Sequence, residues 1–112
     1  MKFEELKNEI KAISFEALRE DSEDFFEAVL VKKDLEDLSS SLSKFFGAPA
    51  FPSDKPLSPQ AQSVVADFGD IMDGQILYFW CQDANAIFAM LWPWGDKEHI
   101  TLKMGQVIIS GS

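Results

Sequence analysis

Cys81 and His99 are the residues of this chain whose types could form a nucleophile and its general base. Such a pair works only when thiol and imidazole lie about 3 Å apart. The strand pattern described below puts Cys81 at one turn of a sheet and His99 at the next. A strand of about seven or eight residues, at ~3.3 Å per residue, separates those turns by about 25 Å. We therefore expect no dyad, with Cys81 a small buried apolar side chain and His99 exposed at a strand start.

Three aspartates, Asp67, Asp70 and Asp73, recur at intervals of three residues and raise the question of a metal site. A calcium loop of the EF-hand type needs ligands at alternate positions, with glycine sixth and glutamate twelfth. This stretch does not meet that pattern, and no neighbouring His or Cys completes a zinc site. The glycines are scattered and form no phosphate-binding loop. The sequence thus predicts no metal, no cofactor and no catalytic residue, and we interpret the aspartates as solvated helix ends and turns.

The strongest group of candidate functional residues is aromatic and comprises Tyr78, Trp80, Trp92 and Trp94. Trp and Tyr dominate the energetically important centres of protein interfaces. Trp92 and Trp94 also flank a proline at a strand end, where indole rings are easily left exposed. We predict that these four residues form an interaction surface. The alternative is that they belong to the core, which must hold for those that face helices.

Acidic residues outnumber basic ones by nineteen to ten, for a formal net charge of −9 over 112 residues. This balance disfavours nucleic acid and anionic membrane surfaces, which are bound largely through Lys and Arg. No Lys or Arg occurs between Pro56 and Asp96. A second acidic cluster fills residues 16–27, where Arg19 is the only base. If the two acidic regions share a face, they would steer a basic partner.

The length and the hydrophobic content of 46% fit one domain with its own core, which we place at residues 1–109, with 110–112 as a frayed tail. Cys81 is the single cysteine, so no intramolecular disulfide can form. The N-terminus lacks an apolar signal segment. The uncharged run at 84–95 is too short and too rich in Pro and Gly to span a bilayer. We therefore expect a cytoplasmic protein.

Residues 74–109 predict three consecutive antiparallel strands. The first, 75–82, and the second, 86–92, are apolar on both faces, so each must be covered on both sides. We place the second strand at the centre of the sheet. The third, from His99 to about Val107, alternates apolar and polar residues and carries a lysine, as is typical of an edge strand. In the first turn, Asn85 is expected to adopt the left-handed conformation.

The N-terminal half predicts two helices and one ambiguous segment. A 3-4-3-4 spacing of apolar residues predicts a helix over residues 2–20. Residues 25–32 can form a strand or part of a helix from 24 to 43. We favour the strand, because Asp34 is a good N-cap for a helix that begins after it and ends near Gly47.

A connection and a third helix follow. Prolines make residues 48–59 a semi-extended linker or covering loop. Ser58 then caps a helix whose first residue is Pro59 and which ends at Gly69. The buried stripe of this helix is expected to include Val64 and Val65.

Helices followed by strands favour an α+β class. We predict three helices packed on a C-terminal three-stranded antiparallel meander, with a fourth strand if residues 25–32 are extended. The leading hypothesis is a non-enzymatic interaction module, an acidic adaptor, inhibitor or chaperone. It would form a homodimer or bind a basic partner through the aromatic sheet face that the helices leave uncovered.

Two other hypotheses belong to different classes. One is a small domain that binds an apolar ligand, or a carboxylate-dependent enzyme, with a pocket between sheet and helices. The other is mimicry of nucleic-acid charge, which requires acids arrayed on one face. The mixture of Glu and Lys in residues 2–20 weakens that last reading.

Overall fold

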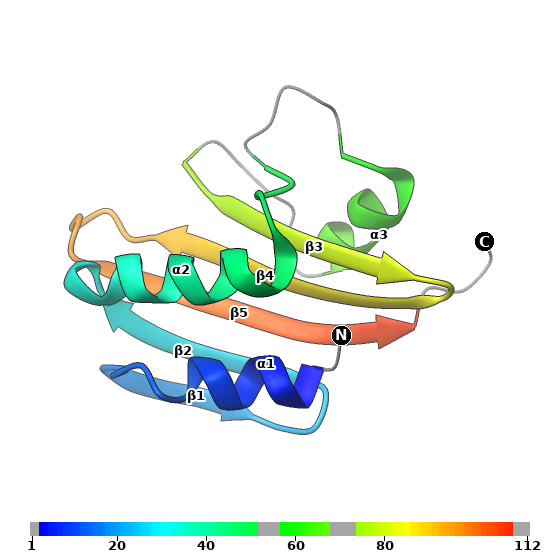
Figure 1. Ribbon diagram of the computed structural model, residues 1–112. Coiled ribbons are helices and arrows are strands. Elements are labelled where there is room, and N and C mark those ends of the chain that lie inside the picture. Colours follow the sequence, from blue (N-terminus) through cyan, green and yellow to red (C-terminus); the bar gives the residue numbers. More distant parts are fainter. Residues whose placement is uncertain (1–2, 52–56, 68–73, 109–112) are drawn as a thin grey trace.

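The computed structural model describes residues 3–51, 57–67 and 74–108. These residues form three α-helices and a five-stranded antiparallel sheet in the order β1-β2-β5-β4-β3 (Figure 1). The α+β class is therefore confirmed. In chain order the elements are α1 (Phe3–Ile10), β1 (Ala17–Asp21), β2 (Phe25–Val31), the short 3-10 helix η1 (Lys32–Asp34), α2 (Leu35–Phe46), α3 (Pro59–Asp67), β3 (Ile76–Gln82), β4 (Asn85–Pro93) and β5 (His99–Ile108).

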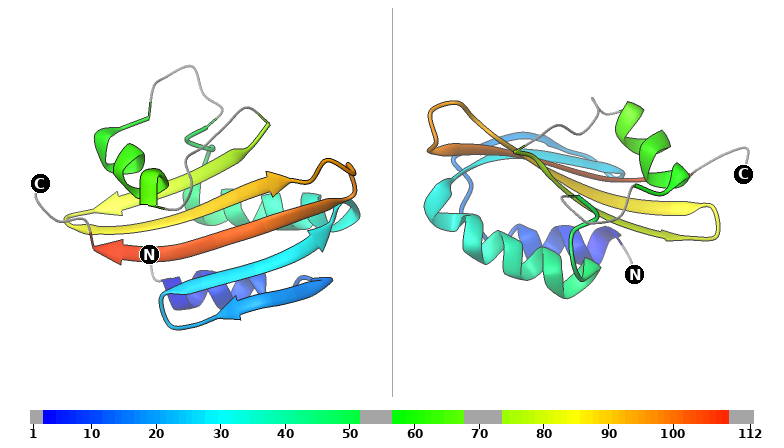
Figure 2. Two further views of the ribbon diagram at one scale, coloured as in Figure 1. Left: turned by 180° about the vertical axis from the view of Figure 1, so that it is seen from behind. Right: turned by 90° about the horizontal axis from the view of Figure 1, so that it is seen from above.

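Helices α1 and α2 pack side by side on one face of the sheet, called here the helix face (Figure 2). Side chains alternate along each strand, so every second residue of β2, β3, β4 and β5 points into this layer. The buried side chains are Phe3, Leu6, Ile10, Phe26, Ala28, Leu30, Leu38, Leu42, Tyr78, Ile87, Ala89, Leu91, Ile100, Leu102 and Met104.

The described residues cover the second face of the sheet over only part of its area. Helix α3 and the segment around Phe51 pack on β3 and β4, where Leu77, Phe88 and Met90 are buried. Phe51 also forms an isolated β-bridge with Leu77. This cover explains how two strands that are apolar on both sides are accommodated within one chain.

The end of α2 and the start of α3 agree with the capping residues read from the sequence, whereas Asp34 precedes α2 without a side-chain capping hydrogen bond. Gly47 follows α2 with φ of 79°, and its N–H donates to the carbonyl of Ser43. The hydroxyl of Ser58 accepts the N–H of Ala61 at 3.1 Å, with Pro59 as the first residue of α3. The predicted end of this helix at Gly69 lies outside the described residues, as do Asp70, Asp73 and the tail at 110–112.

The prediction of one helix over residues 2–20 is wrong beyond Ile10. A turn follows α1, and residues 17–21 form β1, which pairs with β2 at the edge of the sheet. All five residues of β1 are exposed, and a bulge between Leu18 and Glu20 shifts its register. The strand therefore lacks the apolar alternation by which strands are recognised in a sequence. The strand predicted at residues 25–32 is confirmed as β2.

The prediction that the third C-terminal strand is an edge strand is also wrong. β5 lies between β2 and β4 and pairs with both. Its Lys103 has Glu27 as cross-strand partner, and its Nζ lies 3.8 Å from the centroid of the Trp92 ring. A lysine can thus occupy a central strand on a half-open face.

The left-handed residue of the β3–β4 turn is Asp83, with φ of 57°, whereas Asn85 is already the first residue of β4. Among the described residues, no helix has the length and apolar character required to cross a membrane.

Candidate functional site

The four aromatic residues predicted as one interaction surface lie on both faces of the sheet. Tyr78 and Trp80 belong to the helix face, and Trp92 packs on the second face. Tyr78 is buried at 4% exposure, with its ring centroid 5.8 Å from that of Phe46. The structure therefore does not bring these four residues together.

Trp94 is 39% exposed but is held by several contacts within the chain. Its indole Nε1 donates a hydrogen bond of 2.8 Å to the hydroxyl of Thr101, which is buried. The Arg19 guanidinium lies 5.8 Å from the ring, and the imidazole of His99 stacks at 4.9 Å. Trp94 thus covers part of the second face near β5, together with the Arg19–Glu27 ion pair of 3.3 Å.

Trp80 lies beside an open hollow of about 850 Å³. The β1–β2 and β3–β4 turns and the end of β5 lie at one end of the sheet, near the start of α1, and this end is called here the hairpin end (Figure 1). The residues that line the hollow place it at the hairpin end. It is lined by Phe3, Glu4, Asp24, Trp80, Gln82, Asp83, Asn85, Ala86, Ile87, Gln106, Val107 and Ile108.

The strand registers place these segments together. Asn85 pairs with Ile108, and Phe25 pairs with Gly105, so both hairpin turns flank the end of β5. Gln106 fixes the β1–β2 turn, because its side-chain amide donates to Asp24 Oδ1 at 2.7 Å and its backbone N–H donates to the Asp24 carbonyl at 3.0 Å. The hollow is therefore built on hydrogen-bonded strand ends.

The charge of this hollow is negative. Glu4, Asp24 and Asp83 contribute carboxylates, and none of the described lining residues is basic. The two acidic regions of the sequence thus meet in part, because Asp24 comes from one and Asp83 from the other. Trp80 adds an aromatic ring, the side-chain type that binds cations best through its π face.

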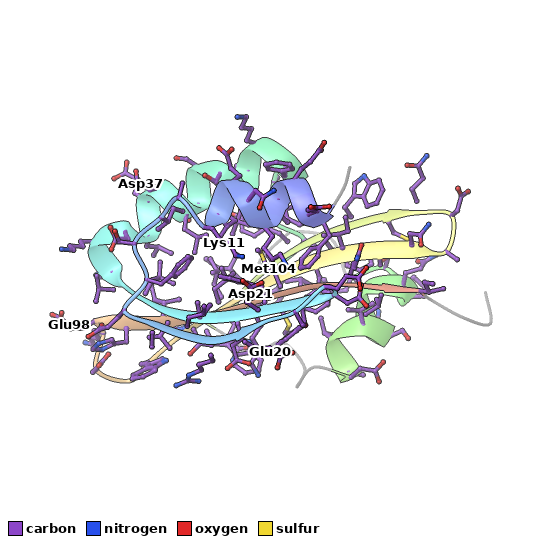
Figure 3. All side chains as sticks on the ribbon, turned by 90° about the horizontal axis from the view of Figure 1, so that it is seen from below. Lys11, Glu20, Asp21, Asp37, Glu98 and Met104 are labelled. Atoms are coloured by element: carbon purple, nitrogen blue, oxygen red, sulfur yellow. The ribbon has the colours of Figure 1, made fainter. Side chains whose placement is uncertain are left out.

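Two lysines lie next to the hollow, but both are engaged by one aspartate. Lys7 Nζ is 3.0 Å from Asp21 Oδ1, and Lys11 Nζ also contacts this carboxylate. Figure 3 shows Lys11, the residue that follows α1, reaching toward Asp21 of β1. Hydrogen bonds from Lys11 and then Lys7 lower the pKa of Asp21, as expected for a carboxylate between two ammonium groups. The ammonium groups of Lys7 and Lys11 are thus already paired with Asp21, which does not line the hollow.

His99 lies at the opposite end of β4 from Cys81, so the structure contains no Cys–His dyad, as expected. The two residues differ from the prediction in their surroundings. Cys81 is exposed, because it lies near the tip of an edge strand, and its thiol donates weakly to the Asp83 carbonyl at 3.8 Å. His99 is partly buried rather than exposed, since Trp94 stacks on it.

His99 is clamped between two carboxylates. Its Nδ1 lies 2.6 Å from Asp96 Oδ2, and its Nε2 lies 2.7 Å from Glu16 Oε2. The Asp96 hydrogen bond and the charges of Asp96 and Glu16 raise the pKa of His99. Backbone N–H groups of Glu98 and His99, followed by the His99 side chain, lower the pKa of Asp96 to about 2. This cluster ties the segment before β1 to the β4–β5 turn.

Sequence reasoning singled out Trp80 but did not find its acidic neighbours as a set. Glu4, Asp24 and Asp83 are far apart in the chain, and only the strand order brings them together. No group of three or more His, Cys, Asp or Glu side chains within the described ranges is arranged to hold a metal ion. The aspartates at 70 and 73 lie outside those ranges.

Comparisons with protein-family models, with curated proteins and with solved structures found no match to this chain.

Proposed function

We propose that this domain is a non-enzymatic interaction module that binds a basic segment of a partner protein. The observation that carries the proposal is the hollow at the hairpin end, where Trp80 lies among Glu4, Asp24 and Asp83 and where the described lining residues include no base. A Lys or Arg side chain of the partner would enter the hollow, with its cation near the indole and the carboxylates.

The physical chemistry favours a cationic occupant over an apolar one. A cation on a tryptophan ring contributes about 0.5–2 kcal/mol, depending on how far it is desolvated. Each exposed carboxylate contributes roughly 0.2–1 kcal/mol to an ion pair at ordinary salt. The net charge of −9 also accelerates the encounter with a basic partner. Together these contributions describe a moderate, salt-dependent interaction.

The test is binding of a fluorescein-labelled oligo-lysine peptide, measured by fluorescence anisotropy at about 0.1 M ionic strength. Glu4→Gln with Asp83→Asn removes two charges of the hollow, and asparagine tolerates the left-handed backbone of position 83. We expect affinity to fall by about five- to tenfold. Glu36→Gln with Asp37→Asn is the control, because it removes two charges from the exposed start of α2.

The control should lower affinity by less than about twofold. Equal losses in both double variants would contradict the proposal, because they would show that only net charge attracts the peptide. Trp80→Leu adds a second arm. It keeps an apolar side chain but removes the ring, and we expect a loss of about threefold or more.

The size of the hollow favours a second candidate, a small organic cation as ligand. Its volume of about 850 Å³ falls within the usual range of ligand pockets. The lining carboxylates favour an amine over the apolar ligand considered from the sequence. Spermidine that displaces the peptide at concentrations far below those of sodium would support this candidate, whereas displacement by ionic strength alone would remove it.

A further inference from the structure

The two edges of the sheet differ in how they resist pairing with another strand. β1 is short, bulged and charged, with Arg19, Glu20 and Asp21 among its five residues. Natural edge strands use these features to prevent association. β3, at the other edge, spans Ile76–Gln82 and contains no charged residue. An additional strand can therefore approach β3 without meeting a charge on it.

The backbone groups of β3 point alternately toward β4 and away from it. Leu77 belongs to the outward set, because its N–H donates to the Phe51 carbonyl at 2.9 Å and its carbonyl accepts the Ala50 N–H at 2.7 Å. By alternation, the N–H and C=O groups of Phe79 and Cys81 also face outward. No segment within the described part of the chain pairs with these two residues.

This open half of β3 adjoins the acidic hollow. Trp80 and Gln82 belong to it, and both line the hollow together with Asp83 of the following turn. The Trp80 side chain packs on the helix face, whereas Phe79 packs on the second face. Cys81 and Gln82 are exposed, and Phe79 and Trp80 are half-buried. A strand added here presents its side chains alternately to the hollow and to the second face.

We propose that the basic segment of the partner binds as an extended strand, antiparallel to β3, along Phe79–Gln82. This inference rests on the proposed function and specifies how the segment is held. Backbone hydrogen bonds to Phe79 and Cys81 fix the segment, as in other cases of strand addition. The residue opposite Trp80 forms a non-hydrogen-bonded pair with it, in which side chains approach most closely. That residue carries the cation.

Charge complementarity selects a basic segment as the occupant. The chain carries a net charge of −9, and no Lys or Arg occurs between Pro56 and Asp96. An acidic strand, or a second copy of this chain, would bring like charges to this edge. A lysine opposite Trp80 instead places its ammonium group at an indole ring and beside a hollow that carries carboxylates.

The two faces of β3 also determine the side-chain pattern of the segment. Residues opposite Phe79 and Cys81 point to the second face, where the Phe79 ring packs with the cluster beneath α3. These positions favour apolar, β-branched side chains. The residues between them point to the helix face, where the hollow favours Lys or Arg. The expected segment therefore alternates basic and β-branched residues.

The first test compares two isomers of a short fluorescein-labelled peptide in which Lys and Val alternate. In one isomer the backbone nitrogens of the valines are methylated, which removes the donors that face β3. In the other the lysine nitrogens are methylated, and these face away from β3. Both isomers have the same charge and composition. By fluorescence anisotropy, we expect the valine-methylated isomer to bind about tenfold more weakly than the unmethylated peptide. The lysine-methylated isomer should bind within about twofold of it.

The second test changes the protein. Cys81→Pro removes one outward N–H without breaking the β3–β4 ladder, and it should weaken binding of the unmethylated peptide by about fivefold. Cys81→Ser keeps that N–H and is the matched control, for which we expect unchanged binding.

Hydrogen exchange of the wild-type protein gives a readout that needs no variant. Free peptide at about ten times its Kd should slow exchange of the Phe79 and Cys81 amides by about tenfold. The Trp80 amide should keep its exchange rate, because its N–H already points to β4.

Equal affinity of the two methylated isomers would overturn the inference, as would unslowed exchange of the Phe79 and Cys81 amides in the complex. The same peptide, measured on Glu4→Gln with Asp83→Asn, separates this failure from failure of the proposed function. Weaker binding to that variant, together with equal binding of the isomers, would keep the hollow as the binding site and remove the strand pairing. Unchanged binding to that variant would remove both.

Discussion

His99 is the only histidine in the chain, so its titration can be followed without assignment. Its imidazole is held between Asp96 and Glu16 at 2.6 and 2.7 Å. Because both carboxylates stabilise the protonated form, its pKa lies above the ordinary value of 6.5. We predict an NMR titration midpoint above that of a histidine in the urea-unfolded chain. Asp96→Asn should lower the midpoint more than Glu16→Gln, and unchanged midpoints would contradict the clamp.

The same cluster makes stability depend on pH in two directions. The raised pKa of His99 adds stability that is complete below 6.5 and is lost as pH rises through the folded value. The pKa of Asp96, lowered to about 2 from 3.8, adds stability above 3.8 that is lost as pH falls through about 2. In urea unfolding of the wild type, the contribution of this cluster to the free energy of unfolding should therefore be largest between pH 3.8 and pH 6.5.

At the scale of elements, the pairing of β2 with β5 depends on Gly105. A Cβ at this position would lie 2.9 Å from the Asp24 carbonyl oxygen and 3.2 Å from ring atoms of Phe25 and Phe88. Gly105→Ala must displace backbone as well as side chains, so we predict a loss of about 1–3 kcal/mol in the free energy of unfolding. Urea denaturation followed by fluorescence measures this loss.

Gly95 provides the matched control for that substitution. It lies in the turn between β4 and β5, and an added Cβ meets nothing within 4 Å. Gly95→Ala should leave stability unchanged or raise it by about 0.4–1 kcal/mol, because alanine restricts the unfolded chain. If Gly105→Ala is as harmless as Gly95→Ala, β2 does not approach β5 as closely as described.

The success of prediction from the sequence followed the strength of each local signal. α2 and α3 were located by Asp34, Gly47 and Ser58, although Asp34 precedes α2 without a side-chain capping hydrogen bond. β1 was missed because its residues are exposed and bulged, so no burial pattern marks it. The predicted position of β5 was wrong, because Lys103 is solvated on the open second face although its strand is central. The position of β5 follows from the strand order, which its own residues do not encode.

The candidate site was predictable only in part for the same reason. Trp80 was recognised by its type, but its grouping with Tyr78, Trp92 and Trp94 assumed one face for all four. Tyr78 and Trp80, two residues apart on β3, do share the helix face. The hollow, however, forms where the ends of several strands lie close together, and which strand ends are neighbours depends on the strand order.

At the scale of the whole molecule, charge is unevenly distributed over the sheet. The hairpin end carries Glu4, Asp24 and Asp83 around Trp80, whereas at the other end His99 lies between Glu16 and Asp96 and offsets part of their charge. A basic partner should therefore be drawn to the hairpin end. The folded protein thus presents a group of acidic side chains at one end, which the composition alone does not show.

The measurement that tests this account most directly is a titration of ¹⁵N-labelled protein with the oligo-lysine peptide, followed through the indole N–H signals of its three tryptophans. We predict that the Trp80 signal shifts progressively and saturates. The Trp94 signal should stay in place, because its N–H is bonded to Thr101 on the other face. A shift of Trp94 with Trp80 unmoved would contradict the assignment of the hollow as the binding site.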